Sequence, residues 1–178
     1  GGVFLDPCAT VVLEAVAEGV SHAVGFEVAA ISYLTRDQQL EVVAVSVSDD
    51  AHDALIGQRT PLEDMEAELR IADQWGSLLF IPAERLAGAP ASGWIPDLEH
   101  DPAAGPDQWR PEDTLRSPLC SPDGELLGIL AVDLPLDGLR PDQERREMLE
   151  MYADLAGIAL SNARRSTELE EQVRLSSA

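Results

Sequence analysis

The sequence predicts an α+β fold in which the first and last helices cover one face of a central antiparallel sheet. Two pairs of β-rich segments, each joined by a short polar link, indicate two β-hairpins. Helical periodicity lies at both ends of the chain. Loops and short helices are expected to enclose a pocket on the other face of the sheet.

The chain has 178 residues, which is enough for one domain with a single core. The composition favours a soluble protein, and the expected location is the cytoplasm. The net charge of −21 repels phosphate backbones and anionic lipid head groups, which argues against nucleic acid and membrane partners. Every basic residue is an arginine, so a P-loop lysine and a Schiff-base lysine are both excluded. Cys8 and Cys120 form no disulfide framework, and no apolar run reaches the roughly 18 residues of a membrane span.

The first elements are a helix and a hairpin. Asp6 and Pro7 are typical of a helix start, an acidic N-cap followed by proline at the first helical position, and the helix should end near Gly25. The segments 28–35 and 40–48 are rich in Val, Ile, Tyr and Thr and predict the first hairpin.

Two short helices, a buried strand and a long connection should follow, at residues 49–56, from Thr60-Pro61 onward, at 77–81 and at 82–113. Long connections inside a compact domain are often functional. The tryptophans of this one, Trp94 and Trp109, either belong to a ligand lid or pin the loop to the body. Its acidic residues are expected to form a solvated face: Asp101, Asp107, Glu112 and Asp113.

The segments 115–120 and 125–134 predict the second hairpin. Strand alternation gives it a mixed face that carries Arg116, Pro118, Cys120, Leu127, Ile129, Ala131 and Asp133. The more apolar face should pack on the terminal helices and carries Leu115, Ser117, Leu119, Leu126, Gly128, Leu130, Val132 and Leu134. A wall of mixed polarity suits a small-molecule site, so the predicted ligand-binding residues are Tyr33, Phe80, Trp94, Trp109, Arg116, Cys120 and Asp133.

The last helix is expected to begin at Pro141 and to reach Leu175. A heptad seam along it predicts a parallel homodimer through the first and last helices. The predicted interface residues are Met148, Tyr152, Leu155, Ala159, Asn162 and Leu169, with Ser166 and Val173 continuing the seam.

The segment Trp109–Ala163, which contains PLCSPDGELLGILAVDLPLDGLRP, closely resembles the end of a GAF domain, and the whole chain fits the GAF plan. GAF domains are sensory modules. The segment is similar to those of actinobacterial signalling proteins, in which GAF domains are joined to diguanylate cyclase, cyclic-di-GMP phosphodiesterase, PAS or histidine kinase domains. The resemblance implies that residues 1–163 form a sensory domain and that 164–178 extend its last helix toward an attached output domain.

The signatures of known GAF subfamilies are missing. Cyclic-nucleotide binders carry an Asn-Lys-x-Phe motif, and this chain has no lysine. Bilin binders use a Cys-His pair, whereas Cys120 precedes Ser121. Haem needs an axial histidine, and His22, His52 and His100 are better explained as boundary or solvated residues. Cyclic mononucleotides, bilin and haem are therefore disfavoured, and the cofactor stays unknown.

Three functions follow from the resemblance. The favoured one is a regulatory domain, not itself an enzyme, that binds a small molecule or transmits a dimer state. The second is a dimerisation module whose pocket is filled. The third is a free methionine-(R)-sulfoxide reductase, which would need several cysteines around the pocket. Cys120 has no evident resolving partner and is expected to pack as a small buried hydrophobe.

Overall fold

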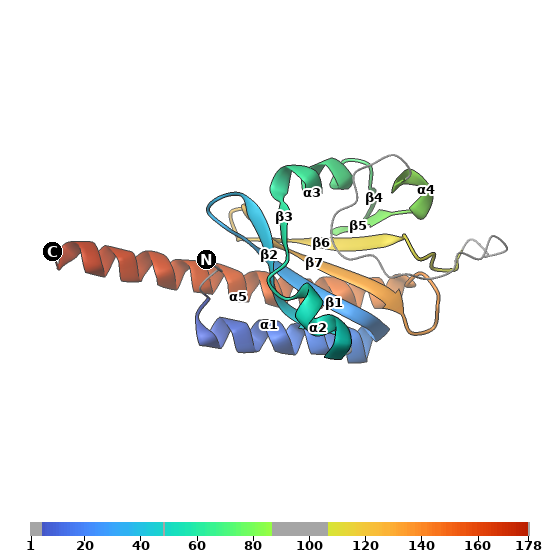
Figure 1. The fold of residues 1–178 in the computed structure, drawn as a ribbon, viewed down its shortest axis with the longest axis horizontal. Coiled ribbons are helices and arrows are strands. Elements are labelled where there is room, and N and C mark those ends of the chain that lie inside the picture. Colours follow the sequence, from blue (N-terminus) through green and yellow to red (C-terminus); the bar gives the residue numbers. More distant parts are fainter. Residues whose placement is uncertain (1–4, 48, 87–106, 178) are drawn as a thin grey trace.

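The computed structural model describes residues 5–47, 49–86 and 107–177, and a seven-stranded sheet runs through this part of the chain (Figure 1). Its strands are β1 (Phe26–Leu34), β2 (Gln39–Ser46), β3 (Arg59–Pro61), β4 (Asp73–Trp75), β5 (Leu78–Ile81), β6 (Thr114–Cys120) and β7 (Leu126–Pro135). They lie in the order β3-β2-β1-β7-β6-β5-β4, and each described pair is antiparallel. The predicted α+β fold with two hairpins is confirmed.

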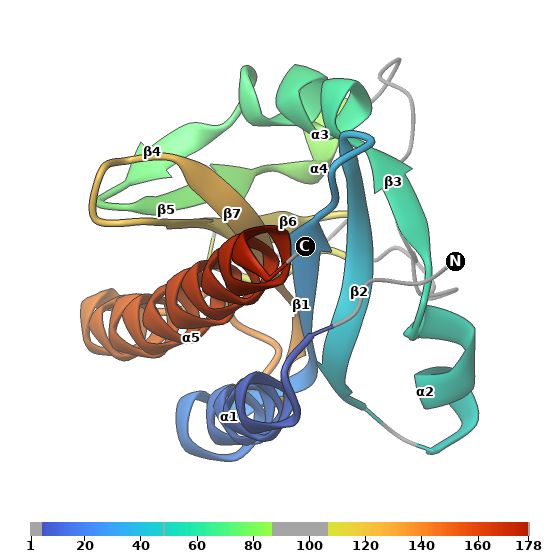
Figure 2. The same ribbon diagram turned by 90° about the vertical axis from the view of Figure 1, so that its left-hand side faces the viewer.

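The first and last helices lie side by side on one face of the sheet (Figure 2). Helix α1 spans Pro7–Gly19 and continues into a π-helical turn, η1, at Val20–Gly25. Helix α5 spans Gln143–Ser176, and its C-terminal part projects past the sheet (Figure 1). Each helix begins after an aspartate, Asp6 or Asp142, whose carboxylate accepts a backbone N–H of the first turn.

The core between this helix pair and the sheet is formed mainly by aliphatic side chains. Leu13, Ala17 and Val20 are completely buried there, as is Leu160 of α5. Among the described helices, the segment Pro7–Gly25 alone is long and apolar enough to cross a bilayer, with a mean hydropathy of 1.2. Its buried side chains pack here as those of a core helix do.

Short helices cover parts of the other face. They are α2 (Asp49–Leu55), α3 (Leu62–Leu69) and α4 (Ala83–Leu86). Under α2 lies a small apolar cluster of Val28, Val45 and Leu55. Under α3 lies a second cluster of Leu40, Met65 and Ile129. The sheet therefore has apolar layers on both faces, and the larger one is on the side of α1 and α5.

The second hairpin pairs in the expected register, with Arg116 opposite Ala131. Three residues depart from the predicted alternation, and the first of them, Leu126, packs with the cluster under α3. A bulge before Cys120 shifts the pairing, and Leu127 packs in the core beneath α5. Leu134 has a φ of 56° and packs instead with the cluster under α2. A bulge sets two residues against one, so strict alternation fails on either side of it.

Candidate functional site

A buried arginine lies on the sheet face opposite α1 and α5. From β6, the Nη1 of Arg116 lies 3.0 Å from the sulfur of Met65, and its Nη2 lies 3.3 Å from a carboxylate oxygen of Glu68. The Glu68 side chain is 3% exposed, so this ion pair is nearly closed to water. The Nε of Arg116 is also buried, and no acceptor in the described part of the chain meets it. Burial holds the pKa of Arg116 below its ordinary value, against the opposing effect of the carboxylates of Glu68 and Asp133.

Asp133 is the second charged group of this face and comes from β7. Its Oδ1 accepts hydrogen bonds from the backbone N–H of Leu134 at 2.8 Å and from the indole Nε1 of Trp109 at 3.1 Å. Burial raises the pKa of Asp133 to about 6, although these hydrogen bonds and Arg116 act in the opposite direction. A carboxyl group with such a pKa can gain or lose its proton near neutral pH.

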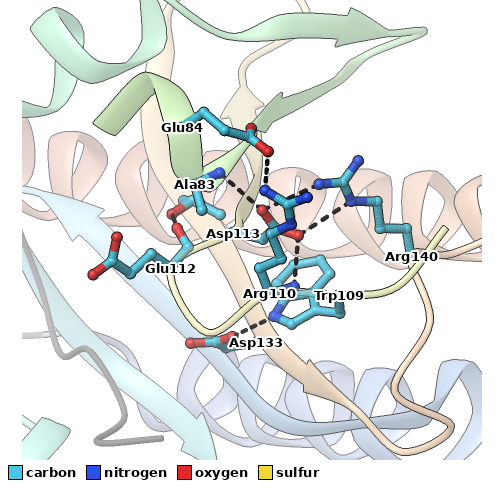
Figure 3. Close-up of polar contacts among 9 residues, drawn as sticks. Ala83, Glu84, Trp109, Arg110, Glu112, Asp113, Asp133 and Arg140 are labelled. Atoms are coloured by element: carbon cyan, nitrogen blue, oxygen red, sulfur yellow. Dashed lines mark hydrogen bonds and ion pairs between the residues drawn. The ribbon is translucent and has the colours of Figure 1, made fainter. Parts of the chain in front are cut away.

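A third charged group, Asp113, is the centre of the polar network in Figure 3. Its carboxylate is completely buried and accepts the backbone N–H of Ala83 at 2.9 Å and that of Arg110 at 2.8 Å. It also accepts the Nε of Arg140 at 3.1 Å. The guanidinium of Arg110 in turn pairs with Glu84. Asp113 thereby joins α4, the segment before β6 and the connection from β7 to α5.

That connection is also tied to the segment before β6 by backbone hydrogen bonds. The N–H of Trp109 donates to the carbonyl of Gly138 at 2.9 Å, and the N–H of Arg140 donates to the carbonyl of Asp107 at 2.8 Å. The two segments thus form a short antiparallel bridge. Trp109, which reaches Asp133 through its side chain, donates one of the two hydrogen bonds of this bridge.

Two stacked aromatic rings that lie between two guanidinium groups anchor the start of α5. The guanidinium carbon of Arg140 lies 4.8 Å from the ring centroid of Phe80. Phe80 stacks on Trp75 with centroids 4.2 Å apart and ring planes 12° apart. The guanidinium of Arg146, in the first turns of α5, lies 3.6 Å from the Trp75 centroid. Such contacts stabilise by about 0.5–2 kcal/mol each, depending on exposure.

The structure separates the residues that were predicted to line one pocket. Arg116 and Asp133 share the face opposite the long helices, as expected. Tyr33 and Phe80 instead pack into the core beneath α1 and α5, because their strand partners belong to that side. The prediction of a single cavity is therefore wrong for these two aromatic residues. Trp94 lies outside the described residues.

Trp109 and Cys120 complete the predicted set. The Trp109 ring is buried against Phe26 and Phe80, while its N–H reaches Asp133, so this residue connects the two sides. Cys120 is exposed at the end of β6, which contradicts its expected packing as a buried hydrophobe. The bulge that precedes it accounts for the difference. The roles of Arg116 and Asp133 in ligand binding stay predictions.

Two residues of this site were missed from the sequence. Asp113, expected in a solvated acidic run, is 2% exposed. Nothing local distinguishes it from its acidic neighbours, because its partners come from distant segments. Glu68 carried a usable signal: it lies three residues after Met65 and hence on the apolar side of the predicted helix. Within the described ranges, no group of three or more His, Cys, Asp or Glu side chains is placed to hold a metal ion.

Tyr33 lines a separate hollow of about 280 Å³ between the tip of the first hairpin and α5. Ion pairs bridge this hollow. Arg36 of the hairpin pairs with Glu171 at 2.6 Å, and Arg164 of α5 pairs with Glu125 at 2.9 Å. These contacts hold the projecting part of α5 against the tips of both hairpins, although exposed pairs of this kind stabilise by at most about 1 kcal/mol each.

The predicted dimer seam divides between two faces of α5. Met148, Tyr152 and Ala159 pack toward the core of their own chain, and their assignment to an interface stays a prediction. Leu155, Asn162 and Leu169 are exposed. A heptad pattern read from sequence cannot tell which stripe faces the protein's own sheet.

A stripe that shares Leu155, Asn162, Ser166, Leu169 and Val173 with this seam runs along α5 and is mostly exposed. It consists of Met151, Leu155, Ile158, Asn162, Ser166, Leu169 and Val173. The spacing follows an eleven-residue repeat, in which Met151, Asn162 and Val173 are equivalent. This repeat corresponds to about 3.67 residues per turn, close to the value of a straight helix. We refer to these seven residues as the outer stripe.

Comparison with solved structures places this fold among GAF domains. The GAF domain of an Acinetobacter phosphoenolpyruvate-protein phosphotransferase has a TM-score of 0.62 at 13% identity, over 88% of this chain and 84% of that one. The phycoerythrobilin-bound GAF domain of a cyanobacterial phytochrome has a TM-score of 0.57 at 13% identity, over 89% and 88%. A GAF domain/HD domain protein from Geobacter sulfurreducens has a TM-score of 0.59 at 8% identity, over 88% and 94%.

At these identities the structural likeness establishes the fold alone. No curated protein matches the sequence. The family model for the GAF domain matches residues 9–160, from the first turn of α1 to the middle of α5. The chain therefore belongs to the GAF family of sensory and regulatory domains in signalling proteins.

Proposed function

We propose that this GAF domain is a non-catalytic sensor that binds a small polar molecule at Arg116 and Asp133 and transmits its occupancy through α5 to an output domain. The observation behind this proposal is the buried Nε of Arg116, which lacks an acceptor in the described part of the chain. A buried donor without a partner costs about 1–3 kcal/mol. A ligand that supplies an acceptor recovers this free energy on binding.

The charges around Arg116 favour a neutral ligand over an anion. The guanidinium is already paired with Glu68, and Asp133 adds a second carboxylate nearby. An anion would be repelled by these groups and by the net charge of −21. A neutral molecule with a carbonyl oxygen for Arg116 and an N–H or O–H for Asp133 can satisfy both groups.

Matched pairs of neutral and anionic compounds test this proposal. Thermal unfolding of the whole chain is followed with nicotinamide against nicotinate and with uracil against orotate, and native mass spectrometry searches the purified protein for a retained small molecule. We expect stabilisation by a neutral amide and none by its carboxylate partner. Arg116→Lys keeps a cation beside Glu68 but lacks the Nε donor, so it should lose this stabilisation. Equal shifts in the wild type and the variant, or no shift and no retained molecule, contradict the proposal.

The output domain is proposed from the family. The Geobacter relative is described as a GAF domain/HD domain protein, so a GAF domain does occur beside another module. The resemblance noted above suggests diguanylate cyclase, phosphodiesterase, PAS or histidine kinase modules for this chain, in an actinobacterial-type protein. Two free, exposed cysteines are consistent with a reducing cytoplasm.

We also propose that the domain forms a parallel homodimer through the outer stripe of α5. Met151 and Ile158 are 52% and 59% exposed, and Val173 on the projecting part is 66% exposed. A second copy offers an identical stripe in register along the whole helix, including the part that projects past the sheet. Asn162 can hydrogen-bond to its symmetry mate and fix this register. The acidity of the chain predicts that salt tightens the dimer.

Sedimentation equilibrium tests the dimer. We expect dimers at tens of micromolar protein in 0.15 M salt, monomers for Leu155→Glu/Ile158→Glu, and dimers for Leu136→Glu. Leu136 is a matched control because it is 65% exposed but lies before α5. A monomeric wild type, or equal loss of association in the control, counts against the outer stripe.

A further inference from the structure

We propose that Trp109 and Arg140 couple the charged face of the sheet to the start of α5, so that a change at Asp133 alters how firmly the first turns of that helix are held. The inference rests on the proposed function for the identity of the physiological stimulus. The contacts themselves are independent of any ligand, and protonation of Asp133 can replace the ligand in a test.

The first link is Trp109, which makes two hydrogen bonds in different directions. Its indole Nε1 donates to Asp133 at 3.1 Å, and its backbone N–H donates to Gly138 at 2.9 Å. The ring between these two groups is only 8% exposed and packs on Phe26 and Phe80. A buried, rigid ring transmits a displacement of one end to the other, because close-packed interiors leave it no free space.

The second link is Arg140. Its backbone N–H closes the bridge at Asp107, and its guanidinium meets the fully buried carboxylate of Asp113 and the face of Phe80. Two residues later, Asp142 caps α5. A movement of the bridge therefore reaches the N-cap of α5 through a single intervening residue, Pro141, whose φ is fixed by its ring.

The helix start is held by the opposite end of the same stack. Arg146 lies over Trp75, whose ring stacks on Phe80. One turn further, Glu150 accepts a hydrogen bond from the hydroxyl of Ser77 at 2.8 Å. The first turns of α5 thus depend on the placement of Phe80, which Arg140 and Trp109 contact directly.

Asp133 is suited to be the group whose change of charge alters this coupling. The charged groups that act on it are Arg116 of β6 and Asp113 before β6, and its hydrogen-bond donors are Trp109 and the backbone of Leu134. Arg116 favours its ionised form, whereas burial and Asp113 favour its neutral form. The pKa of Asp133, about 6, reflects this balance. A hydrogen bond to an ionised acceptor is roughly twice as strong as one to a neutral acceptor. The strength of the hydrogen bond from the Trp109 indole to Asp133 therefore changes with the charge of Asp133.

Hydrogen exchange by mass spectrometry tests this coupling on the whole chain. The wild type, Trp109→Phe and Asp133→Asn are compared at pH 5.0 and 7.5, with exchange times scaled for the intrinsic rate. In the wild type we expect amides of residues 138–152 to be about fivefold better protected at pH 7.5 relative to the amides of the core strands, because the charged acceptor strengthens the indole hydrogen bond. The pH effect should vanish in both variants.

Trp109→Phe removes the donor, while Asp133→Asn keeps an acceptor oxygen and removes the titration. If Trp109→Phe does not fold, the asparagine variant decides the matter alone. Protection of residues 138–152 that is independent of pH in the wild type overturns the proposal, as does a pH effect of equal size in Asp133→Asn. Neither result bears on whether an amide binds at Arg116, so failure of the coupling and failure of the sensor proposal remain distinguishable.

Discussion

The ring of Tyr152 in α5 lies directly against Gly19 of α1, where a Cβ atom would come within 2.5 Å of its Cε1. The two helices approach closely at this point because position 19 has no side chain. This contact packs Tyr152 against the intramolecular core.

Gly19→Ala should therefore destabilise the domain. Alanine favours the helix by up to about 1 kcal/mol over glycine, but overpacking costs about 1–3 kcal/mol. We expect a net loss of about 1 kcal/mol in the free energy of unfolding, measured by urea denaturation. The double variant Gly19→Ala/Tyr152→Leu should be more stable than the sum of the single effects, since the shorter side chain makes room. A Gly19→Ala protein as stable as the wild type would show that the ring moves aside without cost.

Asp133→Asn should change how stability depends on pH. The pKa of Asp133 in the folded chain, about 6, lies above its unfolded value near 3.8. The folded state thus binds the proton more tightly, so the stability from this group is present below pH 4 and is lost as pH rises through 6. Asparagine does not ionise, so the variant does not lose this stability as pH rises. The variant should gain about 1–3 kcal/mol on the wild type between pH 4 and pH 7, as measured by chemical denaturation across that range.

Asp113→Asn should be strongly destabilising although it preserves the shape of the side chain. The buried carboxylate accepts four hydrogen bonds, two of them from Arg140. An amide brings a nitrogen toward these donors and removes the negative charge that faces the guanidinium of Arg140. We expect a loss of about 3 kcal/mol in the free energy of unfolding. Glu112→Gln is the neighbouring control at an exposed position and should change stability by less than about 0.5 kcal/mol.

Cys120→Ser should leave stability nearly unchanged, within about 0.5 kcal/mol, because the thiol is exposed. We also expect no reduction of free methionine sulfoxide by the wild-type chain in an assay coupled to thioredoxin and NADPH. Turnover in the wild type that disappears in Cys120→Ser would establish the reductase in place of the sensor.

The secondary structure of this chain was largely predictable because its signals are local. Both hairpins follow from β-rich segments around short polar links. The first long helix follows from Asp6 before its first turn, and the last begins two residues after the expected Pro141. Strand β4, with three residues, was not predicted, because its pairing with β5 supplies what its own sequence lacks.

The site was less predictable because long-range contacts decide which charged residues are buried. Arg116 and Asp133 could be placed on one face from alternation along the second hairpin. The burial of Asp113 depends on Ala83 and Arg140, which are about thirty residues away in each direction along the sequence. For a related reason, the burial of Ala159 against its own chain could not be inferred from the helix alone.

The projecting part of α5 makes the chain sensitive to angular phase. Each residue inserted there would turn everything beyond it by about 100° and shift it by about 1.5 Å. Insertions of 7 or 11 residues would restore the original direction to within about 20°, whereas an insertion of 2 would nearly reverse it. The orientation of a module joined after Ser176 would then vary periodically, and not gradually, with the length of the linker. In a pair of helices, the eleven-residue spacing of the outer stripe would set the period after which the original direction returns.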